Sequence, residues 1–160
     1  MIELNFKAIT GELNIDGLPL KIDTEEGLCR CDLYHGLVKQ RAIKKIIPNH
    51  YLVDSLAFFE REFQVTIRPV CYGFPFMLHL VDKNSQYYKL LNDWNARTNI
   101  NMLNESVKSL SDWLKESLNL DTPDTTKTDI IRWNFEWERV SVSYETKSFN
   151  HGAYIVWNLT

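Results

Sequence analysis

Hydrophobic and polar residues alternate along the first part of the chain. Leu13 and Ile15 alternate with polar neighbours before the dipeptide Asp16-Gly17, and Leu18 and Leu20 alternate after it. This dipeptide supplies the positive φ angles that a two-residue type I′ turn requires. Such a turn places Ile15 opposite Leu18 and Leu13 opposite Leu20, so that all four apolar side chains share one face. The pattern therefore predicts an N-terminal β-hairpin.

The middle of the chain has mostly helical spacing of its apolar residues. We expect helices over residues 38–47, 52–63, 87–94 and 107–118, with Pro48 ending the first and Ser85 capping the third. Alternation over residues 29–33 predicts a short strand, and residues 76–81 predict a buried strand between the helices. Residues 121–128 are rich in Asp and Thr and contain a proline, which is typical of a loop.

The last third returns to period-two alternation and predicts a three-stranded meander. A turn at Glu138-Arg139 would pair Phe135 with Val142 and Trp133 with Tyr144 and collect the apolar side chains on one face. The same register places Arg132 opposite Glu145 on the other face. We expect the Trp-rich face to be core covered by helices, and a binding platform is the alternative interpretation.

Strands, helices and then strands predict a single α+β domain over residues 1–160. In it an antiparallel sheet, made of the N-terminal hairpin and the C-terminal three-stranded meander, packs against three to four helices. Hydrophobic residues make up 44% of the chain and charged residues 24%, which is typical of a globular protein.

Charge and processing signals narrow the class of protein. The 18 basic and 21 acidic side chains leave a net charge of −3, which disfavours a dedicated nucleic-acid binder. No signal peptide is recognisable, no apolar stretch is long enough to span a membrane, and three cysteines form no secreted disulfide framework. We therefore expect a cytoplasmic protein that binds neither nucleic acid nor membrane directly.

The sequence contains few candidate residues for metal binding or catalysis. Cys29-x-Cys31 with His35 could suggest a metal, but cysteines alternating with charged residues are more typical of a buried strand face, so we expect no metal and no cofactor. The chain has no phosphate-binding glycine loop and no known catalytic motif, which predicts a protein that is not an enzyme. A small enzyme or ligand-binding protein that uses Cys71, His79 or Glu136 remains an alternative, as does an adaptor subunit.

Two segments of the chain resemble a known family of proteins. The hairpin FKAITGELNIDGLPLKI (residues 6–22) and the Trp-rich meander IIRWNFEWERVSVSYETKSFNHGAYIVWN (residues 130–158) resemble immunity proteins of contact-dependent growth inhibition and related polymorphic toxin systems. The resemblance implies a non-enzymatic inhibitor that binds the C-terminal domain of one cognate toxin, often a nuclease, in the cytoplasm of the producing cell.

Acidic side chains are the contact residues we expect for such an inhibitor, because a nuclease cleft is basic. They lie in predicted loops and strand edges: Asp121, Asp124, Asp129, Glu136 and Glu138. Glu25 and Glu26, in the predicted loop after the first hairpin, form an alternative patch.

Overall fold

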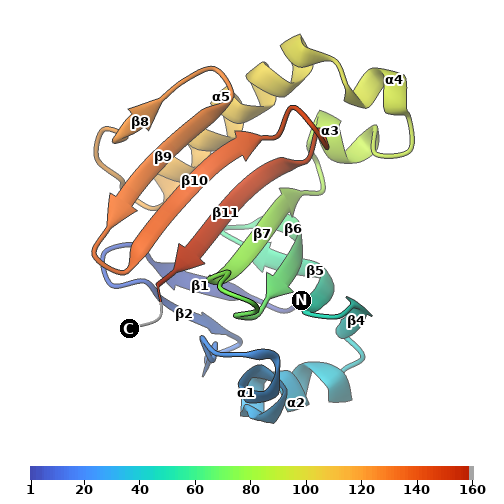
Figure 1. The fold of residues 1–160 in the computed structure, drawn as a ribbon, viewed down its shortest axis with the longest axis vertical. Coiled ribbons are helices and arrows are strands. Elements are labelled where there is room, and N and C mark those ends of the chain that lie inside the picture. Colours follow the sequence, from blue (N-terminus) through green and yellow to red (C-terminus); the bar gives the residue numbers. More distant parts are fainter. Residues whose placement is uncertain (159–160) are drawn as a thin grey trace.

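The structure is a computed structural model that describes residues 1–158, and it contains two antiparallel sheets and five helices (Figure 1). The smaller sheet has the order β1-β2-β3, with strands β1 (Leu4–Lys7), β2 (Glu12–Ile15) and β3 (Leu18–Pro19). The larger has the order β4-β5-β6-β7-β11-β10-β9-β8. Its strands are β4 (Ile43–Ile47), β5 (His50–Phe58), β6 (Arg61–Arg68), β7 (Phe76–Asp82), β8 (Thr125–Thr126), β9 (Ile130–Phe135), β10 (Glu138–Tyr144) and β11 (His151–Trp157). The helices are α1 (Glu25–Arg30), α2 (Asp32–Lys39), α3 (Gln86–Lys89), α4 (Trp94–Arg97) and α5 (Ile100–Ser117).

The expected α+β class and the N-terminal hairpin are confirmed. Ile15 pairs with Leu18, and Asp16 (φ 50°) and Gly17 (φ 80°) occupy the turn. The Asp16 carboxylate also accepts a hydrogen bond from the backbone N–H of Glu3 at 2.8 Å, which ties the turn to the chain just before β1. The hairpin belongs to the separate three-stranded sheet, however, and does not extend the sheet that contains the meander.

The C-terminal meander β9-β10-β11 is confirmed, but the predicted register of its first hairpin is wrong. Trp133 pairs with Val140 rather than with Tyr144, and the turn lies at residues 136–137. Trp137 is held in this turn because its indole N–H donates to the backbone carbonyl of Ala8 at 2.7 Å. Val140 and Tyr144 are an even number of residues apart, so both registers leave the same side chains on the core face.

Two predicted helices and one predicted strand are wrong. Residues 43–47 form β4, and residues 52–63 form most of the hairpin β5-β6, with Phe59 and Glu60 at positive φ in its turn. A β-bulge between Val53 and Leu56 interrupts the period-two pattern of β5, so that apolar residues three apart both face the core, which imitates helical spacing. Residues 29–33 belong to α1 and α2, which meet at Cys31.

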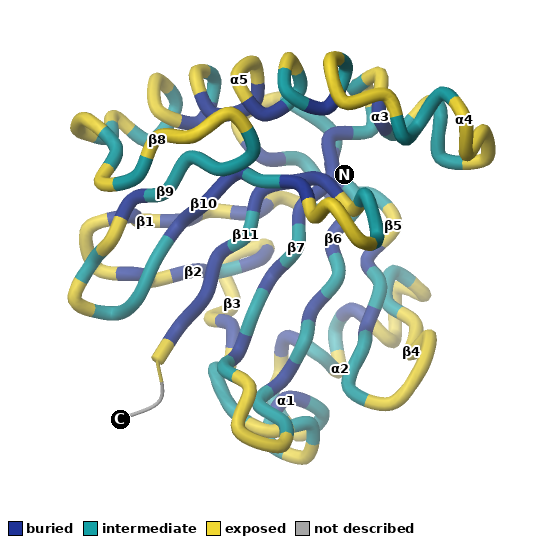
Figure 2. The backbone as a smooth tube through the Cα atoms, turned by 45° about the horizontal axis from the view of Figure 1, so that its top comes forward, coloured by how far each residue is buried: buried dark blue, intermediate teal, exposed yellow. Residues whose placement is uncertain are grey.

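One face of the large sheet is the core face. Helix α5 packs on it with four buried aliphatic residues, Leu103, Val107, Leu110 and Leu114. Figure 2 shows the exposed residues of α5 on its outer side and the buried ones toward the sheet. Trp133 is only 3% exposed on this face, which confirms that the Trp-rich face is core.

The small sheet packs on the same face, beside α5. The ring of Phe6 contacts Trp157 and Trp137 edge-on, at centroid distances of 6.5 and 5.6 Å. The indole N–H of Trp157 donates to the carbonyl of Gly11 at 2.7 Å, which anchors the end of β11 to the turn between β1 and β2. Within residues 1–158, no helix combines the length and the apolar character that crossing a lipid bilayer needs.

Candidate binding face

The opposite face of the large sheet is left uncovered by any helix or strand of the described chain. In Figure 1, α5 and the small sheet lie behind β9, β10 and β11, so this face is turned toward the viewer. A hollow of about 480 Å³ lies on it, lined by residues of β4, β5, β6, β7, β9, β10 and β11. We call this surface the open face and define it by Arg68, His79, Arg132, Arg139 and Tyr154.

Strand register explains why three arginines border the hollow. Arg139 pairs with Val156, Val156 with Met77, and Met77 with Arg68, so these residues form one row across β10, β11, β7 and β6. Neighbouring strands are about 4.8 Å apart, which places the α-carbons of Arg139 and Arg68 on the order of 14 Å from each other. Arg132, on β9, pairs with Ser141 two residues along β10 from Arg139.

An aromatic pair occupies the centre of the open face. The rings of His79 and Tyr154 are stacked, with centroids 4.5 Å apart and planes 1° from parallel. His79 Nε2 lies 3.0 Å from the backbone carbonyl of His151, to which it must donate because a carbonyl only accepts. Burial lowers the pKa of His79 and raises that of Tyr154, so both side chains are neutral near pH 7. The centre is therefore a rigid, uncharged plate between the guanidinium groups.

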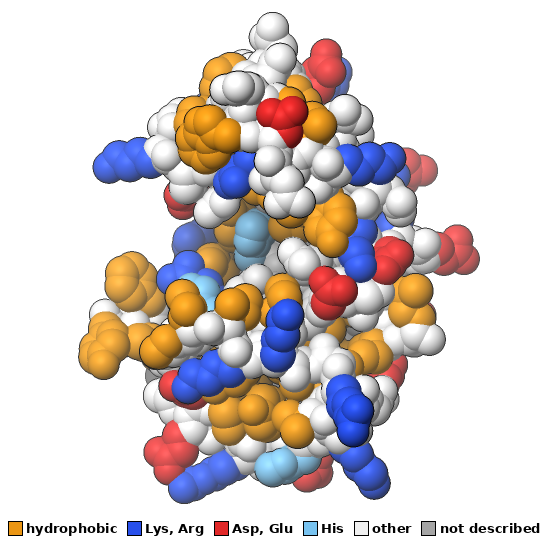
Figure 3. All heavy atoms as spheres, turned by 90° about the vertical axis from the view of Figure 1, so that its right-hand side faces the viewer, with side chains coloured by type: hydrophobic (Ala, Val, Ile, Leu, Met, Phe, Trp, Pro, Cys, Tyr) orange, Lys and Arg blue, Asp and Glu red, His pale blue; other side chains and the backbone are white. Residues whose placement is uncertain are grey.

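Exposed apolar side chains extend the open face at one end. A second hollow of about 390 Å³ shares Arg68, Met77 and Arg139 with the first and reaches the turn between β6 and β7. Tyr72 and Phe74 in this turn are 94% and 64% exposed. Figure 3 shows hydrophobic side chains protruding from the lower half of the molecule. Exposed aromatic clusters beside polar groups are typical of protein-binding sites.

The local backbone directs Tyr72 outward. Cys71 and Phe74 exchange two backbone hydrogen bonds, N–H to O, of 3.3 and 2.8 Å, which closes a tight turn over Tyr72 (φ 46°) and Gly73 (φ 82°). Both central residues have positive φ, as in a type I′ turn. The hydrogen bonds thus hold an aromatic residue at the rim of the second hollow.

The charges of the open face differ from those of the chain as a whole. Arg68 and Arg132 form no ion pair and no side-chain hydrogen bond with any residue of 1–158, and the Nε atom of Arg132 is buried without an acceptor. Arg139 pairs with Glu138 at 2.5 Å. Glu145, an exposed residue, is the other carboxylate near the hollow. A chain with a net charge of −3 thus presents a positively charged surface here.

The sequence predicted a different cross-strand partner for Arg132. The expected pair with Glu145 is wrong, because the shifted register of β9 and β10 sets Arg132 opposite Ser141. The alternation of apolar and polar residues in β9 and β10 was the sequence signal that could have located two arginines of the open face. Residues between the core positions of β9 and β10 must face away from the core, and among them are Arg132 and Arg139.

The predicted acidic contact residues do not form one patch. Asp121 and Asp124 lie in the loop before β8 at one edge of the sheet, and Glu136 lies in the turn between β9 and β10. Glu26, of the alternative patch, is on α1 at the other end of the molecule (Figure 1). The Asp124 carboxylate accepts a hydrogen bond from the backbone N–H of Asn134 at 2.7 Å. Asp129 is half-buried just before β9.

Two further members of this set are engaged within the molecule. Glu138 pairs with Arg139, as noted above. Glu25 accepts a hydrogen bond from the Tyr51 hydroxyl at 2.5 Å and pairs with Lys45 at 2.6 Å. The hydrogen bonds of Lys45 and Tyr51 lower the pKa of Glu25. This carboxylate therefore helps to join α1 to β4 and β5.

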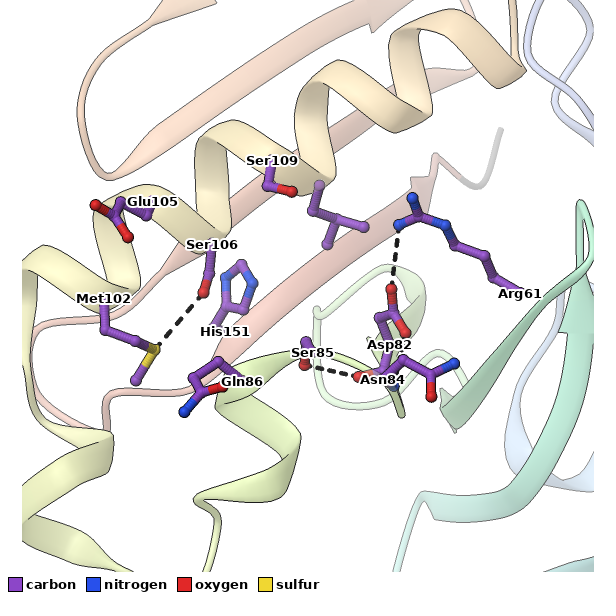
Figure 4. Close-up of a pocket in the computed structure, with 11 residues that line it drawn as sticks. Arg61, Asp82, Asn84, Ser85, Gln86, Met102, Glu105, Ser106, Ser109 and His151 are labelled. Carbon is purple, nitrogen blue, oxygen red and sulfur yellow. Dashed lines mark hydrogen bonds and ion pairs between the residues drawn. The ribbon is translucent and has the colours of Figure 1, made fainter.

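A separate, larger cavity of about 700 Å³ lies on the core side, between α5 and the ends of β7 and β11 (Figure 4). The Asp82 carboxylate faces it and is bound by Arg61 at 3.2 Å and by the backbone N–H of Asn84 at 2.8 Å. Figure 4 shows His151 beside Ser106, with the Asp82–Arg61 pair across the cavity.

These side chains do not form a nucleophile–base–acid relay. His151 Nδ1 donates to the backbone carbonyl of Ser143 at 3.1 Å, so a carbonyl rather than Asp82 orients the imidazole. The Ser106 hydroxyl donates to the sulfur of Met102 at 3.6 Å. Burial lowers the pKa of His151 to about 4, which keeps the ring neutral. The cavity is a polar gap under α5 in which Asp82, Ser106 and His151 are already bonded to other groups.

The cysteines and histidines singled out in the sequence lie on different elements. The Cys29 sulfur is 3.2 Å from the Tyr51 hydroxyl, and His35 is exposed on α2. Cys71 lies in the β6-β7 turn. Within residues 1–158, no three His, Cys, Asp or Glu side chains converge closely enough to hold a metal ion.

In comparisons with known proteins, no family model, no curated protein and no solved structure matches this chain.

Proposed function

We propose that this chain is an immunity protein that neutralises a cognate bacterial toxin domain by docking on it with the open face. The observation that carries the proposal is the uncovered half of an eight-stranded sheet, with arginines around its hollow and the exposed Tyr72 and Phe74 at its end. Tyr and Arg are enriched among the residues that dominate binding energies at protein interfaces.

The rigidity of the open face supports this proposal. Its arginines and the His79–Tyr154 pair lie on strands that are hydrogen-bonded to neighbours on both sides, so their backbones are fixed before a partner arrives. A backbone that is already ordered loses little further conformational entropy on binding, and this lowers the cost of association.

The proposed mechanism is steric. A stable interface covers about 800 Å² on each partner, which is enough to close the active site of a nuclease-sized domain. No bond is made or broken, and no cofactor is required. In this proposal the inhibitor acts in the cytoplasm of the cell that produces the toxin.

An enzyme built on Cys71, His79 or Glu136 is less well supported. His79 donates its Nε2 proton to a backbone carbonyl, and Cys71 and Glu136 lie in turns of different hairpins. Catalysis by these residues would need a nucleophile and a base within hydrogen-bonding distance.

Co-expression tests the proposed function. The toxin domain encoded beside this gene is expressed in a sensitive strain with the wild-type chain, with Tyr72→Ala/Phe74→Ala, or with Trp94→Ala. Trp94 is another exposed aromatic (56%), on α4 at the opposite end of β7 and β11 from Tyr72 and Phe74, and serves as the matched control. We expect protection by the wild type and by Trp94→Ala, and loss of protection by the double variant. Growth arrest in the presence of the wild type would refute the proposed function.

A further inference from the structure

We infer that the open face binds a carboxylate-rich segment of its partner, and this inference rests on the proposed function of the same face. The sequence alone pointed the other way, toward acidic residues of this chain on a basic cleft. The structure places those acidic residues around β8, at the β9–β10 turn and on α1, and gathers Arg68, Arg132 and Arg139 around one hollow.

Two of the arginines on the open face lack a partner for their guanidinium groups within the part of the chain that the structure describes. Arg68 and Arg132 have no carboxylate partner among residues 1–158, and Arg132 Nε is buried without an acceptor. A guanidinium group offers several N–H donors in a plane that matches the two oxygens of a carboxylate. An incoming Asp or Glu would therefore pair with guanidinium groups that have no carboxylate partner among the described residues.

The spacing of the arginines across the sheet limits which segments can contact all of them. Arg68 is separated from Arg139 and Arg132 by the neutral row of Met77 and Val156. A segment that crosses the face needs carboxylates at both ends and an uncharged middle to lie on the His79–Tyr154 plate. Consecutive strand residues are about 3.3 Å apart, so an extended segment of about four or five residues spans the row.

Charge favours a short acidic segment over a nucleic acid. The hollow is bordered by three arginines but also by Glu145, Glu138 pairs with Arg139, and the whole chain carries a net charge of −3. A long polyanion on this face would also lie close to these carboxylates, within the Debye length of about 10 Å at 0.1 M salt. A peptide with a few carboxylates places its charge only where the arginines are.

Binding of short labelled probes tests the inference without the toxin. Fluorescence anisotropy at 50 mM NaCl compares a 12-residue peptide with Glu at every fourth position and Ser between, its Gln counterpart, and a 12-nucleotide single-stranded RNA. We expect the Glu peptide to bind at least tenfold more tightly than either of the others. We also expect Arg68→Gln/Arg132→Gln to lose at least tenfold in affinity for it. Lys108→Gln/Lys115→Gln removes the same charge from exposed positions on α5 and should change this affinity less than twofold.

The outcomes separate this inference from the proposed function. Equal binding of the Glu and Gln peptides, tighter binding of RNA, or equal losses in the two double variants would overturn the inference. Full protection from the toxin by Arg68→Gln/Arg132→Gln would also overturn it while leaving the immunity function intact. Binding of the Glu peptide to the open face without protection from the toxin by the wild type would support the inference and refute the immunity function.

Discussion

Gly152, on β11, is a position where the open face admits no side chain. A Cβ atom there would lie 2.5 Å from the backbone oxygen of Leu80 and 2.6 Å from His79 Nε2. We predict that Gly152→Ala destabilises the protein by about 1–3 kcal/mol, because a rigid strand must move to relieve the contact. Thermal denaturation followed by circular dichroism measures the effect.

Gly36 supplies the matched control. It lies within α2, and a Cβ atom there would meet nothing within 4 Å. Gly36→Ala should stabilise the protein by up to about 1 kcal/mol, because alanine is the better helix former. Equal melting temperatures for the two variants would contradict the close packing at His79.

His151 makes the stability depend on pH. Burial lowers its pKa from 6.5 to about 4, so below pH 6.5 the unfolded chain takes up a proton that the folded chain does not. This contribution to stability is complete above pH 6.5 and is lost as the pH falls toward 4, by up to about 1.4 kcal/mol per pH unit. We expect urea denaturation at pH 7.5, 6 and 5 to show the loss.

A variant assigns the pH dependence to this residue. His151→Asn keeps a donor for the Ser143 carbonyl but cannot be protonated, so its stability should fall less steeply between pH 7.5 and 5 than that of the wild type. His35→Asn, at an exposed position on α2, should keep the wild-type slope. Equal slopes for His151→Asn and the wild type would show that other groups take up the proton.

The N-terminal hairpin depends on glycine in two different ways. Gly17 has φ 80° and open space around it, so Gly17→Ala should cost about 1 kcal/mol through backbone conformation alone. Gly11 has φ 73°, and its Cβ would lie 2.5 Å from the ring of Trp137. Gly11→Ala should therefore cost clearly more than Gly17→Ala in chemical denaturation. The reverse order would mean that the small sheet is not fixed against Trp137.

Trp133 anchors strand β9 to the core. Its indole N–H donates to the carbonyl of Asp121 at 2.9 Å, and the side chain is 3% exposed. Trp133→Ala should destabilise the protein by about 3–5 kcal/mol. Trp94→Ala, at a 56% exposed site, should leave the melting temperature nearly unchanged. An unchanged melting temperature for Trp133→Ala would contradict the placement of this face in the core.

Local patterns predict some elements of this fold and miss others for a physical reason. The turn at Asp16-Gly17 and the meander could be predicted because their chemistry is local: positive φ in one, regular alternation in the other. Strand β5 could not, because its bulge sets Val53 and Leu56 on the same side and imitates a helix. The register of β9 and β10 is fixed by the contact of Trp137 with Ala8, which is distant in the sequence.

At the scale of the whole molecule, the candidate site depends on which face of the large sheet stays uncovered. Alternation predicts that Arg132 and Arg139 lie away from the core, but Arg68 joins them only through the order β6-β7-β11-β10-β9. That order brings residues 68 and 139 onto one row, and no local pattern encodes it. The acidic residues expected from the sequence lie instead around β8, at the β9–β10 turn and on α1.

The binding affinity of the purified toxin domain for two charge-reversal variants tests the central claim most directly. Arg68→Glu/Arg132→Glu changes the open face, whereas Asp121→Lys/Glu136→Lys changes two exposed acidic positions expected from the sequence to contact the partner. Isothermal titration calorimetry should show at least a tenfold loss of affinity for the arginine variant and less than a twofold change for the acidic one. Tight binding by the arginine variant together with a loss in the acidic variant would contradict the assignment of the open face as the binding surface.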